Sequence, residues 1–103
     1  MINPFLAEKL PEVQRLFKEH QIKRAYAFGS VVTDKFSVNS DIDFLVTFEY
    51  DPDPLVRGER WWNLYFKLQD LLDRNVDLLT EDQIKNPYLI ESINSNKVLI
   101  YGN

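Results

Sequence analysis

The stretch Ser40-Asp41-Ile42-Asp43-Phe44-Leu45-Val46-Thr47-Phe48 decides how the whole chain is interpreted. Large apolar side chains occupy every second position of it, at Ile42, Phe44, Val46 and Phe48. This alternation predicts a β-strand with one strongly apolar face. Asp41 and Asp43 fall on the opposite face, where residues two apart lie roughly 6.5 Å from each other and point the same way. The two carboxylates can therefore converge on metal ions beside the sheet.

A third aspartate lies in a second predicted strand, residues 76–79. Asp77 and Leu79 share one face of it, and Val76 and Leu78 share the other. If the two strands are neighbours in register, Asp77 faces the same side as Asp43. Two Mg²⁺ ions about 3.5–4 Å apart, bridged by carboxylates, can activate an attacking oxygen and stabilise a leaving pyrophosphate. Asp77 could bind the metal nearer the nucleophile or act as the general base.

A glycine turn supplies the complementary half of this chemistry. A short strand predicted over residues 24–28 ends at Gly29-Ser30. Glycine lets backbone N–H groups approach phosphate oxygens closely, and the serine hydroxyl adds one more donor. Asp-x-Asp and Gly-Ser are common patterns when taken singly, whereas their ordered combination is much more specific. The combination predicts a site for a nucleotide triphosphate carried by metal ions.

The remaining sequence predicts helices around these strands. Helical spacing and capping residues place them at about Pro11–His20, about Leu55–Arg74 and Asn86 to about Asn94, with Asn3-Pro4 able to cap a shorter turn. A last strand is predicted over residues 98–101. We expect an α/β (α+β) fold with a small mixed β-sheet flanked by helices. Because no repeat or linker divides the chain, residues 1–103 are expected to form one domain.

Composition narrows the class of function. The chain of 103 residues is 45% hydrophobic and 27% charged, as in ordinary globular proteins. Its net charge of −4 makes a broad grip on nucleic acid unfavourable. The absence of cysteine excludes disulfides and thiolate metal sites. No apolar run approaches the roughly 20 residues that a bilayer requires, so we expect a cytoplasmic protein without membrane contact.

In the order of its motifs the chain resembles the polymerase-β-like nucleotidyltransferases, whose signature is Gly-Ser, then Asp-x-Asp on a strand, then a single Asp on the neighbouring strand. The resemblance covers nearly the whole chain. Its size and its closing stretch, residues 86–101, are similar to the minimal branch (MNT). Members of this branch are often encoded beside a helical HEPN protein, and the pair behaves as toxin and antitoxin. The resemblance implies transfer of a nucleotidyl group, usually AMP from ATP.

The same resemblance implies roles for five residues. Gly29 and Ser30 would contact the triphosphate of ATP. Asp41 and Asp43 would bind both Mg²⁺ ions. Asp77 would complete the catalytic triad and the metal site.

The chain departs from the family pattern directly after Gly-Ser. The family commonly has an arginine there, whereas this chain has Val31-Val32-Thr33-Asp34. A fixed guanidinium contact to phosphate is hard to replace. Arg57, Arg60 or Lys35 could compensate, although a solvent-facing position is the more ordinary expectation for each.

Three hypotheses follow for the function. The leading one is a Mg²⁺-dependent protein adenylyltransferase whose acceptor is a hydroxyl on a partner chain, because about 100 residues leave little room for a second-substrate pocket. The second is a non-catalytic, nucleotide-binding antitoxin that acts by complex formation. The third is an adenylyltransferase for a small molecule such as an aminoglycoside.

Overall fold

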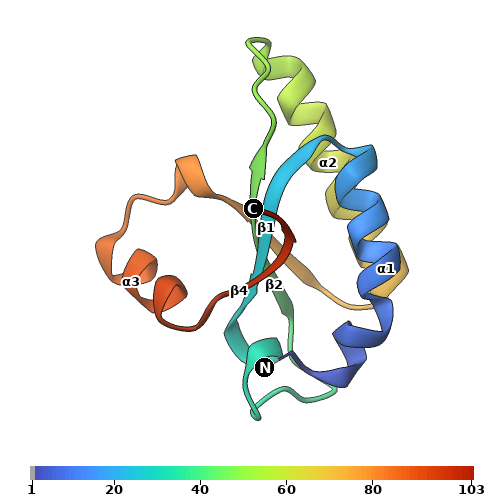
Figure 1. The fold of residues 1–103 in the computed structure, drawn as a ribbon, viewed down its shortest axis with the longest axis vertical. Helices are drawn as coiled ribbons and strands as arrows, with labels where there is room; N and C mark the ends of the chain where they lie inside the picture. The colour runs from blue at the N-terminus through green and yellow to red at the C-terminus, as the bar shows by residue number, and fades with distance from the viewer. Residues whose placement is uncertain (1) are drawn as a thin grey trace.

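The computed structural model describes residues 2–103, which form one four-stranded mixed sheet and three α-helices (Figure 1). In chain order the elements are α1 (Pro4–Glu19), β1 (Ile22–Phe28), the 3₁₀ helix η1 (Gly29–Val32), β2 (Ile42–Phe48), α2 (Pro54–Leu72), β3 (Val76–Thr80), the 3₁₀ helix η2 (Glu81–Gln83), α3 (Pro87–Asn96) and β4 (Val98–Gly102). The predicted fold class is confirmed.

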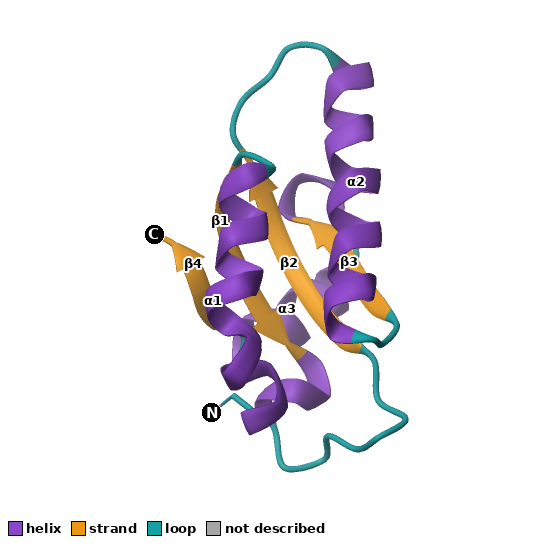
Figure 2. Cartoon of the chain, turned by 90° about the vertical axis from the view of Figure 1, so that its right-hand side faces the viewer, coloured by secondary structure: helices purple, strands orange, loops and turns teal. Residues whose placement is uncertain are grey.

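The order of strands across the sheet is β3-β2-β1-β4. β2 and β3 are parallel, whereas β1 is antiparallel to both β2 and β4. The parallel pair needs a crossover connection, and α2 provides it. Figure 2 shows α1 and α2 side by side on one face of the sheet and α3 on the other.

The core lies mainly between the sheet and the α1–α2 layer. Ile42, Phe44 and Val46 of β2 are fully buried in it, so the predicted apolar face is confirmed. A smaller cluster under α3 contains Leu45 of β2 together with Phe28 and Ile93. The side of β2 that carries Asp43 and Leu45 therefore faces α3, and only part of that side is covered.

α1 is longer than the sequence predicts. Instead of a helix over Pro11–His20 preceded by a separate turn, one helix runs over Pro4–Glu19. Its cap is Asn3, whose side-chain oxygen accepts a hydrogen bond from the Phe5 N–H at 2.9 Å. Pro11 lies inside the helix, where it removes one backbone hydrogen bond. Packing outweighs that loss, because the buried stripe continues across the proline at Leu6, Val13 and Phe17.

α2 also closes the outer edge of the sheet. The Trp61 indole N–H donates to the Leu78 carbonyl at 3.1 Å, and the Val76 N–H donates to the Gln69 side chain at 3.4 Å. Both bonds involve backbone groups of the edge strand β3, which would otherwise be open to another strand. On the opposite edge, the Gln14 side chain donates to the Ile100 carbonyl of β4 at 2.8 Å.

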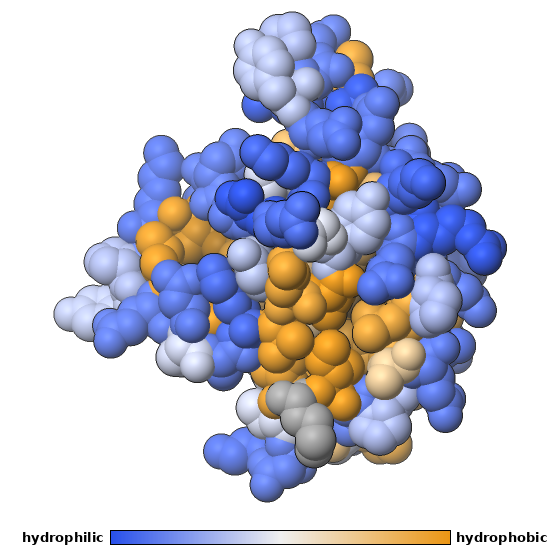
Figure 3. All heavy atoms as spheres, in the orientation of Figure 1, coloured by the Kyte–Doolittle hydropathy of each residue, from blue (hydrophilic) through white to orange (hydrophobic). Residues whose placement is uncertain are grey.

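Hydrophobic side chains gather on the surface in the middle of the face seen in Figure 3, where α1 and β4 lie, with hydrophilic side chains around them. Large apolar residues exposed on the molecule as a whole include Val38, Tyr50, Leu55, Trp62, Phe66, Tyr88, Leu89, Ile90 and Leu99. Scattered exposed apolar residues are ordinary in globular proteins, whereas a contiguous apolar patch is typical of surfaces that contact another molecule. None of the helices in residues 2–103 combines the length and apolar character that crossing a membrane requires.

The packing of α2 gives a direct test of this fold. Leu68 is fully buried, whereas Phe66 on the same helix is 58% exposed. We expect Leu68→Ala to lower the free energy of unfolding by about 2–5 kcal/mol, because it leaves a cavity in the core. Phe66→Ala removes more atoms but should cost much less. Urea denaturation of both variants measures the contrast, and equal losses would contradict the assignment of Leu68 to the buried face of the helix.

Candidate functional site

The structure brings the three predicted aspartates to one end of the sheet. Asp43 is directly opposite Asp77 in the parallel β2–β3 ladder, so both side chains point to the α3 face. Asp41 precedes β2 by one residue and is exposed, rather than lying inside the strand as the sequence predicts. Asp43 is half-buried and Asp77 is exposed. The three carboxylates therefore lie at the start of two neighbouring strands.

Asp43 is the electrostatic centre of this group. Burial, then the charge of the Asp77 carboxylate, a proton shared with it and the charge of Asp41 together raise the pKa of Asp43 to about 6. The carboxylates of Asp77 and Asp41 thus oppose ionisation of Asp43. A cation beside Asp43 would stabilise the ionised form of its carboxylate.

Gly29 faces Asp43 across the site. It has a φ of +74°, a conformation that side chains rarely adopt, and it connects β1 to η1. A Cβ atom at this position would collide with the Asp43 carboxylate oxygen. Only glycine therefore lets the turn come this close to the carboxylates, as close approach of backbone to a phosphate would also require.

The residues after Gly29 differ from the family pattern, and the structure shows where their side chains lie. Ser30 is half-buried in η1, and its carbonyl accepts hydrogen bonds from the Thr33 N–H and hydroxyl at 3.0 and 2.9 Å. Val31 and Val32 are buried in the core. They help to anchor η1 under the site, and they leave no basic side chain at the position where the family commonly has arginine.

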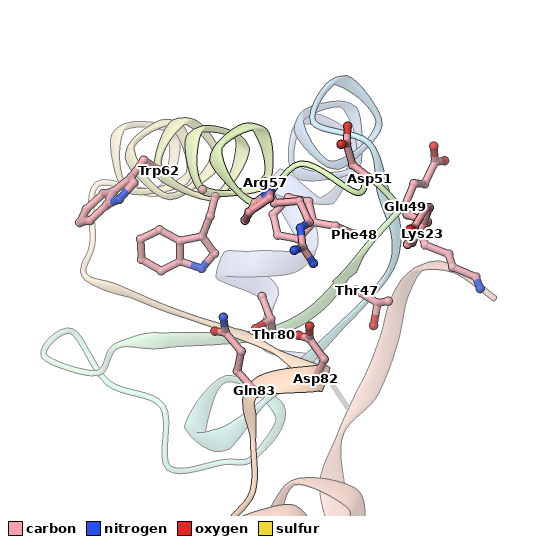
Figure 4. A pocket seen from close by; sticks show the side chains of 14 residues that line it. Lys23, Thr47, Phe48, Glu49, Asp51, Arg57, Trp62, Thr80, Asp82 and Gln83 are labelled. Atoms are coloured by element: carbon pink, nitrogen blue, oxygen red, sulfur yellow. The ribbon is translucent and has the colours of Figure 1, made fainter.

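The basic residues that could substitute for the missing arginine lie away from the aspartates or are exposed to solvent. Arg60 forms an ion pair with Asp51, with 3.1 Å between Nη2 and Oδ2. Arg57 lines a cavity of about 700 Å³ between the start of α2 and the far ends of β2 and β3, beside Trp61 (Figure 4). Lys35 is exposed in the loop after η1. Arg57 and Arg60 therefore do not replace the missing arginine.

That cavity is larger than the hollow of about 490 Å³ beside Asp41, yet it lies at the opposite end of β2. Its lining combines aromatic side chains with charged ones of both signs, among them Lys23 and Asp82. Catalysis depends on the groups that can hold the reacting atoms rather than on volume. We therefore place the candidate site at the aspartates.

The donor set suits Mg²⁺. Carboxylate oxygens are the ligands that this ion prefers, and a divalent cation would relieve the repulsion between Asp43 and Asp77. Within residues 2–103, no three His, Cys, Asp or Glu side chains are already arranged around one point as metal ligands. Metal binding by Asp41, Asp43 and Asp77 therefore stays a prediction that rests on their chemistry and their shared end of the sheet.

The family model described as Polymerase beta, Nucleotidyltransferase matches residues 11–103, and the chain belongs to this family. Two relatives from Methanocaldococcus jannaschii, each provisionally named a protein adenylyltransferase, are 35% and 33% identical to it. The first alignment covers 84% of this chain and 86% of the relative, and the second covers 92% and 94%.

Solved structures show the same fold. A chain from a toxin–antitoxin structure with AMP-PNP matches with a TM-score of 0.72 at 24% identity, over 91% of this chain and 73% of that chain. A chain from the Shewanella oneidensis complex of a tri-AMPylated HEPN toxin with its MNT antitoxin matches with a TM-score of 0.67 at 21% identity. That match covers 94% of this chain and 72% of the other. A structure provisionally described as a minimal nucleotidyltransferase gives 0.69 at 28%, over 95% of both. The resemblance to the minimal branch is confirmed.

Two glycines allow a matched test of the site turn. Gly29→Ala should destabilise the protein by about 1–2 kcal/mol from its positive φ alone, and further because Cβ displaces Asp43. Gly58→Ala meets no atom within 4 Å on the exposed side of α2 and should stabilise by about 0.5–1 kcal/mol. Thermal unfolding of the two variants should therefore shift in opposite directions.

The raised pKa of Asp43 predicts a pH-dependent stability difference. Because this pKa rises from its ordinary 3.8 to about 6 on folding, the folded state binds the proton more tightly than the unfolded chain. The associated stability is fully present below pH 3.8 and is lost as the pH rises through about 6. Without divalent metal, Asp43→Asn should gain stability relative to the unaltered protein between pH 4 and pH 7. Denaturation at each pH measures the difference in free energy of unfolding between the two proteins. A difference that does not change with pH would contradict the raised pKa of Asp43.

Proposed function

We propose that this chain transfers AMP from ATP to a hydroxyl group of a helical HEPN-type partner, and so acts as the antitoxin of a toxin–antitoxin pair in the cytoplasm, where ATP is available. One observation carries the proposal: Gly29 abuts Asp43, which lies beside Asp77. Membership of the nucleotidyltransferase family supports the reaction class. Relatives named as protein adenylyltransferases and a neighbour complexed with an AMPylated HEPN toxin support a protein acceptor.

Each predicted site residue has a role in this proposal. Gly29 and Ser30 bind the triphosphate through the N–H groups and hydroxyl of the turn. Asp41, Asp43 and Asp77 hold two Mg²⁺ ions, which when bound would neutralise phosphate charge and lower the pKa of the acceptor hydroxyl. The acceptor oxygen bonds to the α-phosphorus as the α–β anhydride bond breaks. Pyrophosphate leaves, and the hydroxyl proton passes to a carboxylate or to water.

The exposed surface of α3 supports a protein acceptor. α3 lies beside η1 and covers only part of the sheet face to which Asp43 points. Tyr88 at its start is 83% exposed, and Leu89 and Ile90 are exposed as well. A partner that buries these apolar side chains would dock on the same face of the sheet as the one to which Asp43 points (Figure 2). Such docking supplies orientation, which by itself can contribute several kcal/mol to lowering the barrier.

One observation favours the second candidate function, a non-catalytic antitoxin that binds nucleotide and neutralises its partner by complex formation. Val31 and Val32 are buried where the family commonly has a phosphate-binding arginine, and neither Arg57 nor Arg60 lies at the site. Weak triphosphate binding would leave complex formation as the main activity.

Mass spectrometry of a co-expressed pair separates the two candidates. With the HEPN-type protein encoded beside this chain, we expect one or more adenylyl adducts on the partner. The adducts should vanish when both Asp41 and Asp43 are changed to Asn, because asparagine keeps the size of the side chain and removes its charge. Asp70→Asn, an exposed change on α2, serves as the control and should leave the adducts in place.

The proposal fails if the unaltered pair forms a stable complex with ATP and Mg²⁺ present while the partner remains unmodified. That outcome would establish the binding-only antitoxin.

A further inference from the structure

We propose that Arg74 is a positioning residue of the carboxylate site, which holds the Ser40 carbonyl and so keeps Asp41 next to Asp43. This inference rests on the proposed function, in which those two aspartates bind metal and nucleotide. Arg74 lies in the turn between α2 and β3, three residues before Asp77. Nothing in the sequence indicates that its side chain reaches the backbone next to Asp41.

The side chain of Arg74 holds the loop that leads into β2. Its Nη1 donates to the Ser37 carbonyl at 2.8 Å and to the Ser40 carbonyl at 2.9 Å. Ser37 and Ser40 also bond to each other, because the Ser37 N–H donates to the Ser40 hydroxyl at 3.0 Å and the Ser40 N–H donates to the Ser37 carbonyl at 3.1 Å. Arg74 thus binds the first and the last residue of a compact turn, Ser37 and Ser40.

Two aromatic rings fix the guanidinium in place. Its central carbon is 4.5 Å from the ring centroid of Phe5, at the start of α1, and 4.5 Å from that of Phe36 in the loop. A planar cation that contacts two rings and two carbonyls has little freedom to turn, and cation–π attraction adds to the hydrogen bonds. One side chain therefore connects α1, the loop and the α2–β3 turn.

The backbone on both sides of Asp41 is held from the same turn. On one side Arg74 binds the carbonyl of Ser40, and on the other the Ile42 N–H donates to the Asn75 carbonyl at 3.1 Å. Asp41 is exposed and would otherwise end a loop free to move. Because Asn75 is only two residues before Asp77, this arrangement ties the first aspartate to the strand that carries the third.

Hydrogen exchange tests the positioning without any ligand. In Arg74→Ala the amides of Ser40 and Ile42, which donate to the Ser37 and Asn75 carbonyls, should exchange faster, while amides farther along β2 and in β1 change little. Guanidinium ion at concentrations far below denaturing ones should slow these two amides again, because it can take the place of the Arg74 guanidinium against the two rings. Methylammonium at equal ionic strength, which cannot stack or bind two carbonyls in one plane, should not.

Calorimetry with Mg²⁺ and ATP tests the consequence for the site. Arg74→Ala should weaken binding about 10- to 100-fold, as is typical for groups that orient metal ligands, and guanidinium should restore part of the affinity. Arg74→Lys keeps the charge but cannot stack in the same way, so it should remain weakened even though it folds. Arg60→Ala is the matched control, since it removes another half-buried arginine at the far end of β2.

Two outcomes overturn the inference. If affinity falls while the Ser40 and Ile42 amides exchange as before, Arg74 acts by touching the nucleotide instead. If those amides are unchanged and affinity is unchanged, Arg74 has no role in the site. Failure of the proposed function is seen separately, as a partner that remains unmodified in the co-expression experiment, and it leaves the exchange result interpretable.

Discussion

The parallel pairing of β2 with β3, which sets Asp43 beside Asp77, is the constraint on which the rest of the structure depends. Two parallel neighbours cannot be joined by a tight turn, so the chain must cross over the sheet, and α2 is that crossover. Placing two like charges side by side is unfavourable in itself. The fully buried apolar face directly behind them, with Ile42 and Phe44 from β2, supplies the opposing stabilisation.

One face of the sheet provides most of the apolar burial, and the other face carries the aspartates. α1 and α2 seal one face with most of the buried apolar side chains. α3 covers the other face over the small cluster of Phe28, Leu45 and Ile93 and leaves the aspartates accessible. At the far end of that face, Arg24 of β1 and Glu81 of η2 form a two-point ion pair, at 2.9 and 3.2 Å. At the near end, the three aspartates form a region of negative charge that no ion pair within residues 2–103 compensates.

Much of this could be predicted from the sequence because the decisive patterns are local. Alternation along β2 revealed its buried face, and the glycine marked its turn. The length of α1 was missed because Pro11 is typical of a first turn, whereas the observed helix continues through it. The contact of Gly29 with Asp43 and the reach of Arg74 to Ser40 join residues far apart in the chain, and such contacts leave no periodic signal. The roles of the five site residues remain predictions.

The capped edges of the sheet constrain how a partner can bind. Trp61 and Gln69 occupy backbone groups of β3, and Gln14 occupies one of β4. Pairing by added strand is a common route both to complexes and to aggregation, and these side chains obstruct it on both edges. Recognition is thereby left to side chains on helices and loops, which can be exchanged one at a time. A domain of this kind can change partners by surface substitution while its sheet, and the carboxylates built on it, stay the same.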